Sequence, residues 1–282
     1  MRKFLFIFAG ILLASAGSLV SAATTFSWNA NTTGDWFAAA NWTNNSGYPS
    51  DGDTVTITNV GSSVVLSNNT ARLADLTLGG ASAGQRTLSF TNWDTCLYAT
   101  NMTILTNGYL TCAGPFTTNS MMSNRVNLVC YSKLAIEGGG AINVNGKGYA
   151  GGSNLTGQTY MPGNGPGAVM DGIKQGPGSH GGAGRTYMAA GQASGGLLTS
   201  KVYDSDTAPL YPGSGGSAGN AVKQYGGNGG GAVCITAAQA GVCRQVLKSD
   251  GFRFAFLCSF FSYPILFNDP FEVSRHPDSD RG

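Results

Sequence analysis

The carboxylates are the side chains whose spacing could support chemistry, because the chain has only two histidines. Hydrolysis of a glycosidic bond needs two placed carboxyl groups, and calcium binds several oxygen ligands together. Asp204 and Asp206 could put two carboxylates on one strand face, since alternate residues of a strand share a face. Asp51 and Asp53 have the same spacing but flank a glycine in a turn-like stretch. The loop around Asp204 lacks the rest of a calcium-binding hand, so both pairs are typical of solvated loop acids.

Motifs for other chemistries are missing from the sequence. It contains no H-E-x-x-H helix and no P-loop lysine. His180 lies in a glycine-rich loop and His276 near the C-terminus, so a multi-histidine metal site is not expected. The glycines 138–140 follow a strand-like run without opening a helix, which argues against a nucleotide site. We therefore predict no catalytic residue, no metal and no cofactor.

Three of the four tryptophans, Trp28, Trp36 and Trp42, lie within a stretch of fifteen residues. They could form a platform that stacks on glycans. They could instead cap the open end of a β-solenoid, where apolar side chains and unpaired strand edges have to be covered. Pro49 and the turn 51–53 then lead into an alternating strand. The sequence favours the cap.

The segment 55–137 carries a weak repeat of strand, turn and strand, which recurs every twenty-six to thirty-two residues. In the first strand of each repeat unit, and again in the second, two apolar residues lie two positions apart. The first strands contain Leu76 and Leu78, Met102 and Ile104, Leu134 and Ile136; the second contain Leu88 and Phe90, Leu110 and Cys112, Ile142 and Val144. No helical period competes with this pattern. It predicts an all-β fold, a parallel β-helix (solenoid) whose coils stack, with a β-sandwich as the alternative.

A glycine-rich tract follows the repeat: residues 138–231 hold 29 of the 43 glycines. The tract has no strict triplet, which excludes collagen. Strand-like residues flank it, at 141–144 and 232–235, and tyrosines are scattered through it. We predict that residues 145–231 are a long insertion that leaves the solenoid after one coil and rejoins it at the next.

The opening stretch also supports a family resemblance. Trp28, Trp36, Asn41-Trp42, Pro49 and the Gly-Asp before the strand resemble the entry segment of bacterial autotransporter-associated β-strand repeat proteins and related glycine-rich exported β-helix surface proteins. The resemblance covers about thirty residues. It implies a right-handed parallel β-helix on or outside the cell surface, and it implies no catalytic residues.

Both ends of the chain differ in texture from the middle. Arg2 and Lys3, the apolar run 4–13 and the small residues 20–23 predict a signal peptide at 1–23. The cap then spans 24–54 and the solenoid with its insertion spans 55–243. Residues 244–282 hold 7 of the 14 phenylalanines. Their composition favours an out-of-frame or disordered tail over a membrane-associating segment.

Two cysteines test the predicted register. Cys96 precedes Met102 by six residues and Cys130 precedes Leu134 by four, so both fall before equivalent coil positions. Stacked strands lie about 4.8 Å apart, which predicts that Cys96 and Cys130 are neighbours, as a disulfide or as stacked thiols. Cys112 belongs to the other strand of its coil and should pair with neither.

Composition and export together predict the function class. The net charge is +2 and Lys and Arg are not clustered, which argues against nucleic acid as a partner. We predict a secreted or outer-surface protein with a structural or adhesive role and no catalysis, whose partner is a cell-surface or extracellular polysaccharide. A β-helix that binds or cleaves polysaccharide is the alternative.

Overall fold

The computed structural model of the chain describes residues 23–43, 46–117, 124–155, 161–168, 170–171, 174–175, 178–179, 202–204, 210–219, 223–240 and 247–248. These residues form two six-stranded parallel sheets and two short two-stranded pairings. The predicted signal peptide, except its last residue, and most of the predicted tail lie outside the described residues. No helix among the described residues is long and apolar enough to cross a membrane. Within the described ranges, one 3-10 turn, η1 (Ala39–Asn41), accompanies the strands.

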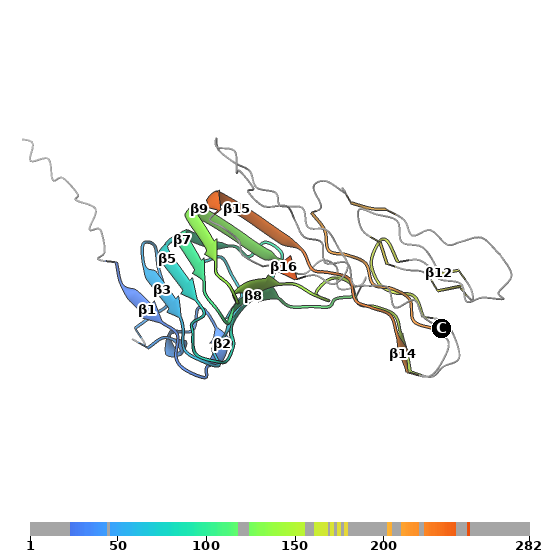
Figure 1. Ribbon diagram of the computed structural model, residues 1–282, viewed down its shortest axis with the longest axis horizontal. Helices are drawn as coiled ribbons and strands as arrows, with labels where there is room; N and C mark the ends of the chain where they lie inside the picture. Colours follow the sequence, from blue (N-terminus) through green and yellow to red (C-terminus); the bar gives the residue numbers. More distant parts are fainter. Residues whose placement is uncertain are drawn as a thin grey trace, which may run out of the picture.

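The strands β1 to β10, and then β15 and β16, alternate between the two large sheets (Figure 1). The first sheet has the order β1 (Thr25–Ser27), β3 (Thr54–Ile57), β5 (Leu73–Leu78), β7 (Leu97–Ile104), β9 (Val126–Ile136), β15 (Val233–Ala240). The second has the order β2 (Thr33–Asp35), β4 (Ser63–Leu66), β6 (Arg86–Phe90), β8 (Gly108–Cys112), β10 (Ala141–Asn143), β16 (Leu247–Lys248). A β-sandwich is built from antiparallel sheets, so the parallel pairing disfavours that alternative.

The predicted repeat is confirmed at the level of single residues. In the first sheet, Leu76 pairs with Met102, and Met102 pairs with Leu134. In the second sheet, Leu88 pairs with Leu110, which pairs with Ile142. A one-residue slip would turn every one of these side chains to the other face, so the apolar alternation was sufficient to set the register.

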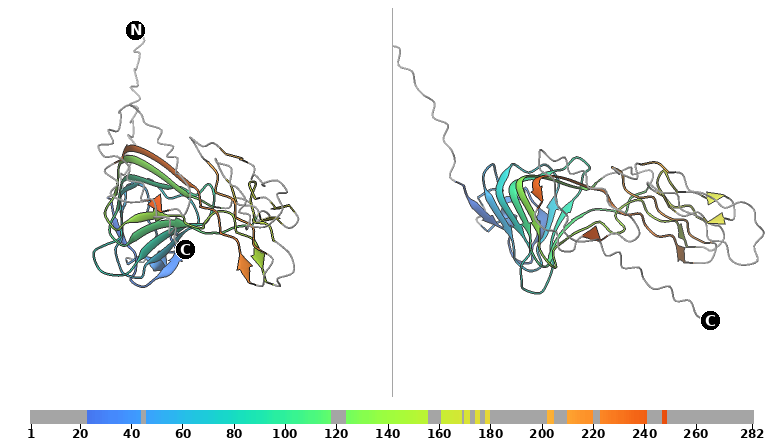
Figure 2. Two further views of the ribbon diagram at one scale, coloured as in Figure 1. Left: turned by 45° about the vertical axis from the view of Figure 1, so that its right-hand side comes forward. Right: turned by 45° about the horizontal axis from the view of Figure 1, so that its top comes forward.

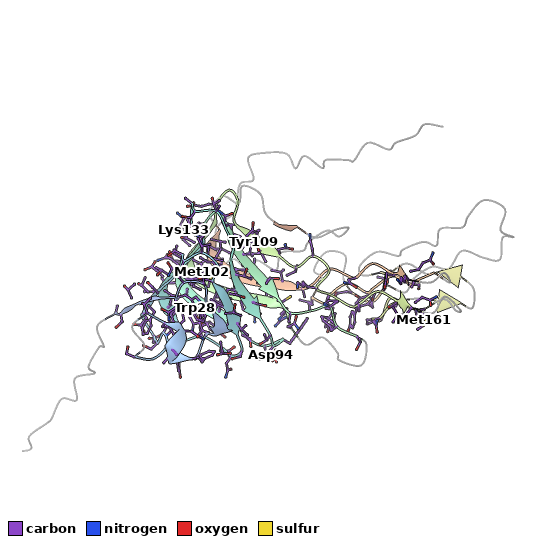
Figure 3. The ribbon with its side chains drawn as sticks, turned by 90° about the horizontal axis from the view of Figure 1, so that it is seen from below. Trp28, Asp94, Met102, Tyr109, Lys133 and Met161 are labelled. Carbon is purple, nitrogen blue, oxygen red and sulfur yellow. The ribbon has the colours of Figure 1, made fainter. Side chains whose placement is uncertain are left out.

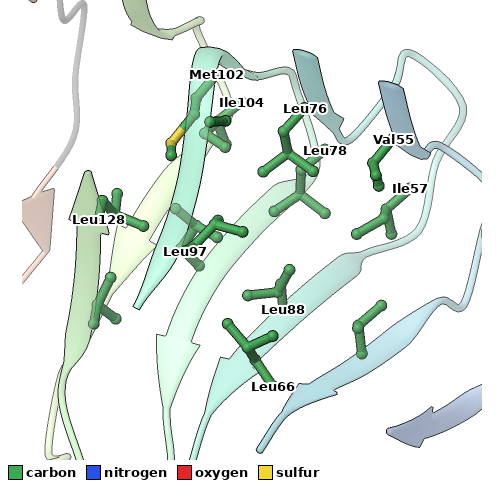
Figure 4. Packing of buried hydrophobic residues seen from close by; sticks show 14 of the residues in the cluster. Val55, Ile57, Leu66, Leu76, Leu78, Leu88, Leu97, Met102, Ile104 and Leu128 are labelled. Atoms are coloured by element: carbon green, nitrogen blue, oxygen red, sulfur yellow. The ribbon is translucent and has the colours of Figure 1, made fainter. Parts of the chain in front are cut away.

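The core lies between the two sheets. Alternate residues of each strand point inward, and the buried apolar side chains of both sheets form one cluster (Figure 4). Val55 and Ile57 of β3 are fully buried in it, as are Val64 and Leu66 of β4. Burial of such side chains contributes roughly 1.5–3 kcal/mol each, so stacked coils stabilise one another through their inner faces.

Glycines allow the corners of neighbouring coils to stack closely. Gly79, after β5, has a φ of +109°, which L side chains rarely adopt. A Cβ on Gly108, in the next coil, would lie 2.3 Å from the carbonyl oxygen of Leu78. Only glycine fits both of these positions.

The glycine-rich insertion leaves the second sheet after β10 and returns the chain to the first sheet at β15. β9 and β15 are adjacent parallel strands, with Val126 paired to Val233, although the whole insertion separates them in sequence. Between them the chain extends away from the two large sheets (Figures 1 and 2). The chain after the insertion thus extends the first sheet beyond β9 by one further parallel strand.

The described part of the insertion is held together by backbone hydrogen bonds with a period of three. Four successive amides, from Gly213 to Gly216, donate to the carbonyls of Gly230, Ser179, Asn164 and Gly227 in turn, at 2.8, 3.2, 2.9 and 2.9 Å. The first and fourth therefore bond the same neighbouring segment, 227–230. Three residues per turn is the geometry of an extended left-handed helix that lacks internal hydrogen bonds. We call this part (148–152, 161–165, 178–179, 213–218 and 226–230) the glycine bundle.

Close contact between backbones explains the composition of the glycine bundle. A Cβ on Gly229 would lie 1.8 Å from the carbonyl oxygen of Gly213, and one on Gly226 would lie 1.9 Å from that of Gly216. A Cβ on Gly215 would lie 2.2 Å from the carbonyl oxygen of Ala150. Glycine density, which usually predicts a flexible linker, here permits backbone-to-backbone packing.

Two predicted boundaries differ from the structure. The segment 24–54, predicted as a cap, already contributes β1 and β2, so the first coil and the cap are one unit. In the predicted tail, Leu247 pairs with Ile142, so the second sheet extends into 244–282. The tail's composition did not indicate this strand, because it is only two residues long.

Candidate functional site

The three clustered tryptophans are completely buried at the first coil. Trp28, Trp36 and Trp42 are each 0% exposed. Trp42 is the centre of the cluster: its ring meets those of Trp28, Trp36 and Phe26 edge to face, with centroids 4.9, 5.0 and 5.9 Å away. Edge-to-face packing is a favoured arrangement of aromatic rings.

Hydrogen bonds of two indoles hold the cluster to the backbone. Trp28 Nε1 donates to the carbonyl of Thr32 at 3.0 Å, and Trp42 Nε1 donates to the carbonyl of Trp36 at 2.8 Å. Trp36 Nε1 is buried without a partner among the described residues. A buried ring cannot stack on a sugar, so the glycan platform proposed for these tryptophans is not what the structure shows. The cap is the role that fits their burial.

Asp53 connects the cap to the first regular strand. Its carboxylate accepts hydrogen bonds from the amide of Thr24, the amide of Ser50 and the hydroxyl of Ser50, each at 2.8 Å. Burial raises the pKa of Asp53, but the hydrogen bonds from Ser50 and Thr24 outweigh it and hold the pKa below its usual value. Asp51-Gly52-Asp53 is therefore a structural turn, as the sequence suggested, with Gly52 at a φ of +80°.

The two cysteines of the register test do not face each other. Cys130 pairs with Ala99, whereas Cys96 precedes Leu97, which pairs with Leu128. Cys96 therefore lies three positions from the partner of Cys130, and both thiols are free. Two of these three positions come from the sequence spacing, six residues before Met102 against four before Leu134, and one comes from a register shift between Ala99 and Asn101, where β9 has one residue more than β7. Cys112 is also free, in the other sheet.

Asp204, one of the acids considered for catalysis, stabilises its own loop. Asp204 accepts hydrogen bonds from the amides of Leu210 and Tyr211, both at 2.8 Å, which is the pattern of a loop-stabilising acid. Asp206, His180 and His276 lie outside the described residues. Among the residues that the structure describes, no three His, Cys, Asp or Glu side chains are grouped to hold a metal ion.

An arginine and a tyrosine stack on the outer face of the first sheet. Arg72, which precedes β5, reaches past β7 to lie over the ring of Tyr131 in β9, with its guanidinium carbon 4.1 Å from the centroid. On the way its Nε donates to the hydroxyl of Thr100 in β7 at 3.4 Å. Tyr131 is 44% exposed. A cation over an aromatic face contributes about 0.5–1 kcal/mol at such a site.

A second arginine–aromatic pair lies at the corner where β7 begins. The guanidinium carbon of Arg125 is 4.6 Å from the ring centroid of Trp93, and its Nε donates to the carbonyl of Trp93 at 3.0 Å. Both side chains are partly exposed, and Asp94 beside them is exposed. Figure 3 shows Asp94 at this corner and Lys133 toward the other end of the same sheet.

Tyr98 lies between the two arginine–aromatic pairs, and a row of polar side chains lies beyond Tyr131. Tyr98 is partly exposed, and Cys96, burial and Tyr131 together raise its pKa. Beyond Tyr131 comes a row in register across three strands, Asp75, Asn101 and Lys133, in which the amide of Asn101 donates to Asp75 at 3.0 Å. We call the five residues Arg72, Trp93, Tyr98, Arg125 and Tyr131 the outer strip.

Sequence reasoning missed the outer strip. Arg72 and Tyr131 are separated by two coils' worth of chain, and their contact depends on the register and on an arginine long enough to span a strand. Trp93 was visible as the one tryptophan outside the N-terminal cluster. Its position in a corner rather than in an alternating strand was a signal that it was not a core residue.

Comparisons with protein-family models, with curated proteins and with solved structures gave no match to this chain. The function is therefore argued from the fold and the outer strip.

Proposed function

We propose that this chain is a right-handed parallel β-helix that acts outside the cell as a non-catalytic binding and structural protein of the surface or matrix. Three features support the β-helix. Consecutive strands alternate between two parallel sheets, equivalent positions stack in register, and one core lies between the sheets. An aromatic cluster at the first coil is what the end of such a stack needs. The resemblance of the segment from Trp28 to the strand at Thr54 agrees with this assignment.

The observation that carries the binding role is the outer strip. Core packing does not require exposed aromatic rings, yet Tyr131 is solvent-exposed and Trp93 and Tyr98 are partly so, and the two arginines lie on two of these rings. Aromatic faces and arginine are the groups most enriched where proteins bind partners. The rigid sheet beneath them holds their relative positions, which is how a solenoid presents an extended binding surface.

The location outside the cell rests on the N-terminal segment, with its two basic residues, apolar run and small residues. Its length and small-residue exit favour a cleaved signal peptide. The proposed location is tested by N-terminal sequencing of protein recovered from the medium or the cell envelope. Cleavage near Ala22 or Ala23 supports export, and retention of Met1 contradicts it.

The binding role is tested with the full secreted chain on a panel of soluble and insoluble glycans. Retention of the protein on at least one glycan, without release of new reducing ends, is the expected result. Release of reducing ends would replace the non-catalytic role by a polysaccharide-cleaving one. Failure to bind any glycan of the panel would remove the binding role.

A further inference from the structure

We infer that the outer strip binds an acidic polysaccharide lengthwise along β9, with its carboxylate or sulfate groups on the two stacked arginines. This inference rests on the proposed binding role and specifies its ligand class. Neither the N-terminal tryptophans nor the scattered acids take part in it.

The geometry of the two pairs favours an anionic group over a neutral one. When a guanidinium lies flat on an aromatic ring, the ring covers one of its faces and the N–H donors point outward in its plane. Nε of Arg72 donates to the hydroxyl of Thr100 and Nε of Arg125 donates to the carbonyl of Trp93, and neither bond uses the terminal N–H groups of its guanidinium. A planar fork of this kind matches a carboxylate or sulfate. Within the described residues, no carboxylate forms an ion pair with either arginine.

The spacing of the pairs favours a long ligand over a small ion. Arg125 immediately precedes β9 and Tyr131 lies within it, six residues further on, both on the outer face. At about 3.3 Å per residue, six residues separate them by roughly 20 Å. Tyr98 lies on the neighbouring strand between the two ends, where a sugar ring can stack on it. A chain with regularly spaced acidic groups can reach both arginines at once, which a single anion cannot.

The charges around the strip favour a sparsely charged polymer. Arg72, Arg125 and Lys133 are positive, while Asp75 and Asp94 are negative and exposed. Nucleic acid carries one charge per phosphate and is bound by dense Lys and Arg clusters, so the two aspartates disfavour it. A polysaccharide with an acidic group on only some sugars fits three cations interspersed with two anions.

Affinity gel electrophoresis of the full chain tests the inference. The gels contain polygalacturonate, a sulfated dextran, plain dextran or single-stranded DNA, each at low and at high salt. Retardation by at least one of the two acidic glycans at low salt, and its loss at high salt, is expected. Arg72→Gln and Arg125→Gln should each raise the apparent dissociation constant about tenfold. Lys223→Gln, which removes the same charge from an exposed position in the glycine-rich insertion, should leave it unchanged.

The other outcomes separate this inference from the proposed binding role. Retardation by plain dextran alone keeps the binding role and overturns the acidic ligand. Retardation by acidic glycans that neither arginine variant weakens places the site elsewhere and overturns the inference. Retardation by single-stranded DNA alone overturns it in favour of a nucleic-acid partner. Retention on an insoluble glycan of the panel, without retardation by any of the four polymers, also keeps the binding role and overturns the inference.

Discussion

Removing the central ring of the aromatic cap should destabilise the whole stack. Trp42 is fully buried and meets three other aromatic rings edge to face. Replacing a buried Trp by Ala costs about 3–5 kcal/mol. Trp42→Ala also leaves the carbonyl of Trp36 without its indole donor. Because both sheets begin at this coil, we expect the loss to lower the free energy of unfolding of the stacked strands together, by about 4 kcal/mol.

The assay is urea unfolding of the full chain followed by far-UV circular dichroism, which reports strands and not the removed fluorophore. Trp93→Ala is the matched control, because the same residue type is removed from a partly exposed corner, where we expect a cost of about 1 kcal/mol. Trp42→Phe keeps a ring and serves if Trp42→Ala does not fold, with an expected cost of about 1–2 kcal/mol. A cost for Trp42→Ala no larger than that for Trp93→Ala would refute the cap.

Four further changes test other parts of the structure. The pKa of Asp53 is lower in the folded state than in the unfolded state, so its stabilisation is complete above about pH 4 and is lost as the pH falls through the folded value. Asp53→Asn should therefore reduce the acid sensitivity of the free energy of unfolding in urea titrations from pH 6 to 3. An unchanged pH profile would contradict this role of Asp53. Arg86 is 2% exposed and donates to the carbonyls of Thr58, Ser82 and Gly84, so Arg86→Met should cost about 3 kcal/mol in the same assay. Arg72→Met on the surface should cost only about 0.5–1 kcal/mol, and equal costs for the two variants would contradict the buried role of Arg86. Gly229→Ala should open the glycine bundle to proteolysis, because the added Cβ would meet the backbone of Gly213. Gly227→Ala should not, because no atom lies within 4 Å of a Cβ at that position. Equal cleavage rates for the two variants would contradict the backbone packing. Burial raises the pKa of the Cys112 thiol to about 12. In the native protein Cys112 should therefore react with maleimide far more slowly than the partly exposed Cys234. Equal labelling of the two cysteines in a peptide map would contradict the burial of Cys112.

The register of the stacked parallel strands could be predicted because its signal is local and repeated. Each strand carries two inward apolar residues, and stacking requires equivalent positions to face each other. The pairings of Leu76 with Met102 and of Leu88 with Leu110 follow from that rule. Cys96 and Cys130 were placed as neighbours although their spacings from Met102 and Leu134 differ by two residues, and the extra residue of β9 increases the offset to three. The shift is marked in β7, whose inward residues change from odd positions at Leu97 and Ala99 to even positions at Met102 and Ile104.

The sequence showed that the clustered tryptophans could form a cap or a glycan platform, and it favoured the cap without showing that they are buried. A run of aromatic residues gives apolar area, but burial depends on the three-dimensional path that brings Trp28 beside Trp42 as bridge partners. The outer strip was less accessible still, because its contacts join residues of different coils. The order of the glycine bundle was not visible, since glycine density alone does not distinguish a linker from backbone packing with a period of three.

The most direct test of the account is the intrinsic tryptophan fluorescence of the full chain during titration with an acidic glycan that retards it. Three tryptophans are buried in the cap and Trp93 is partly exposed in the outer strip. The account predicts a saturable emission change that disappears in Trp93→Phe, while that variant still binds and its remaining emission stays constant. A change that persists in Trp93→Phe would place the ligand at the N-terminal cluster and contradict both the buried cap and the outer strip.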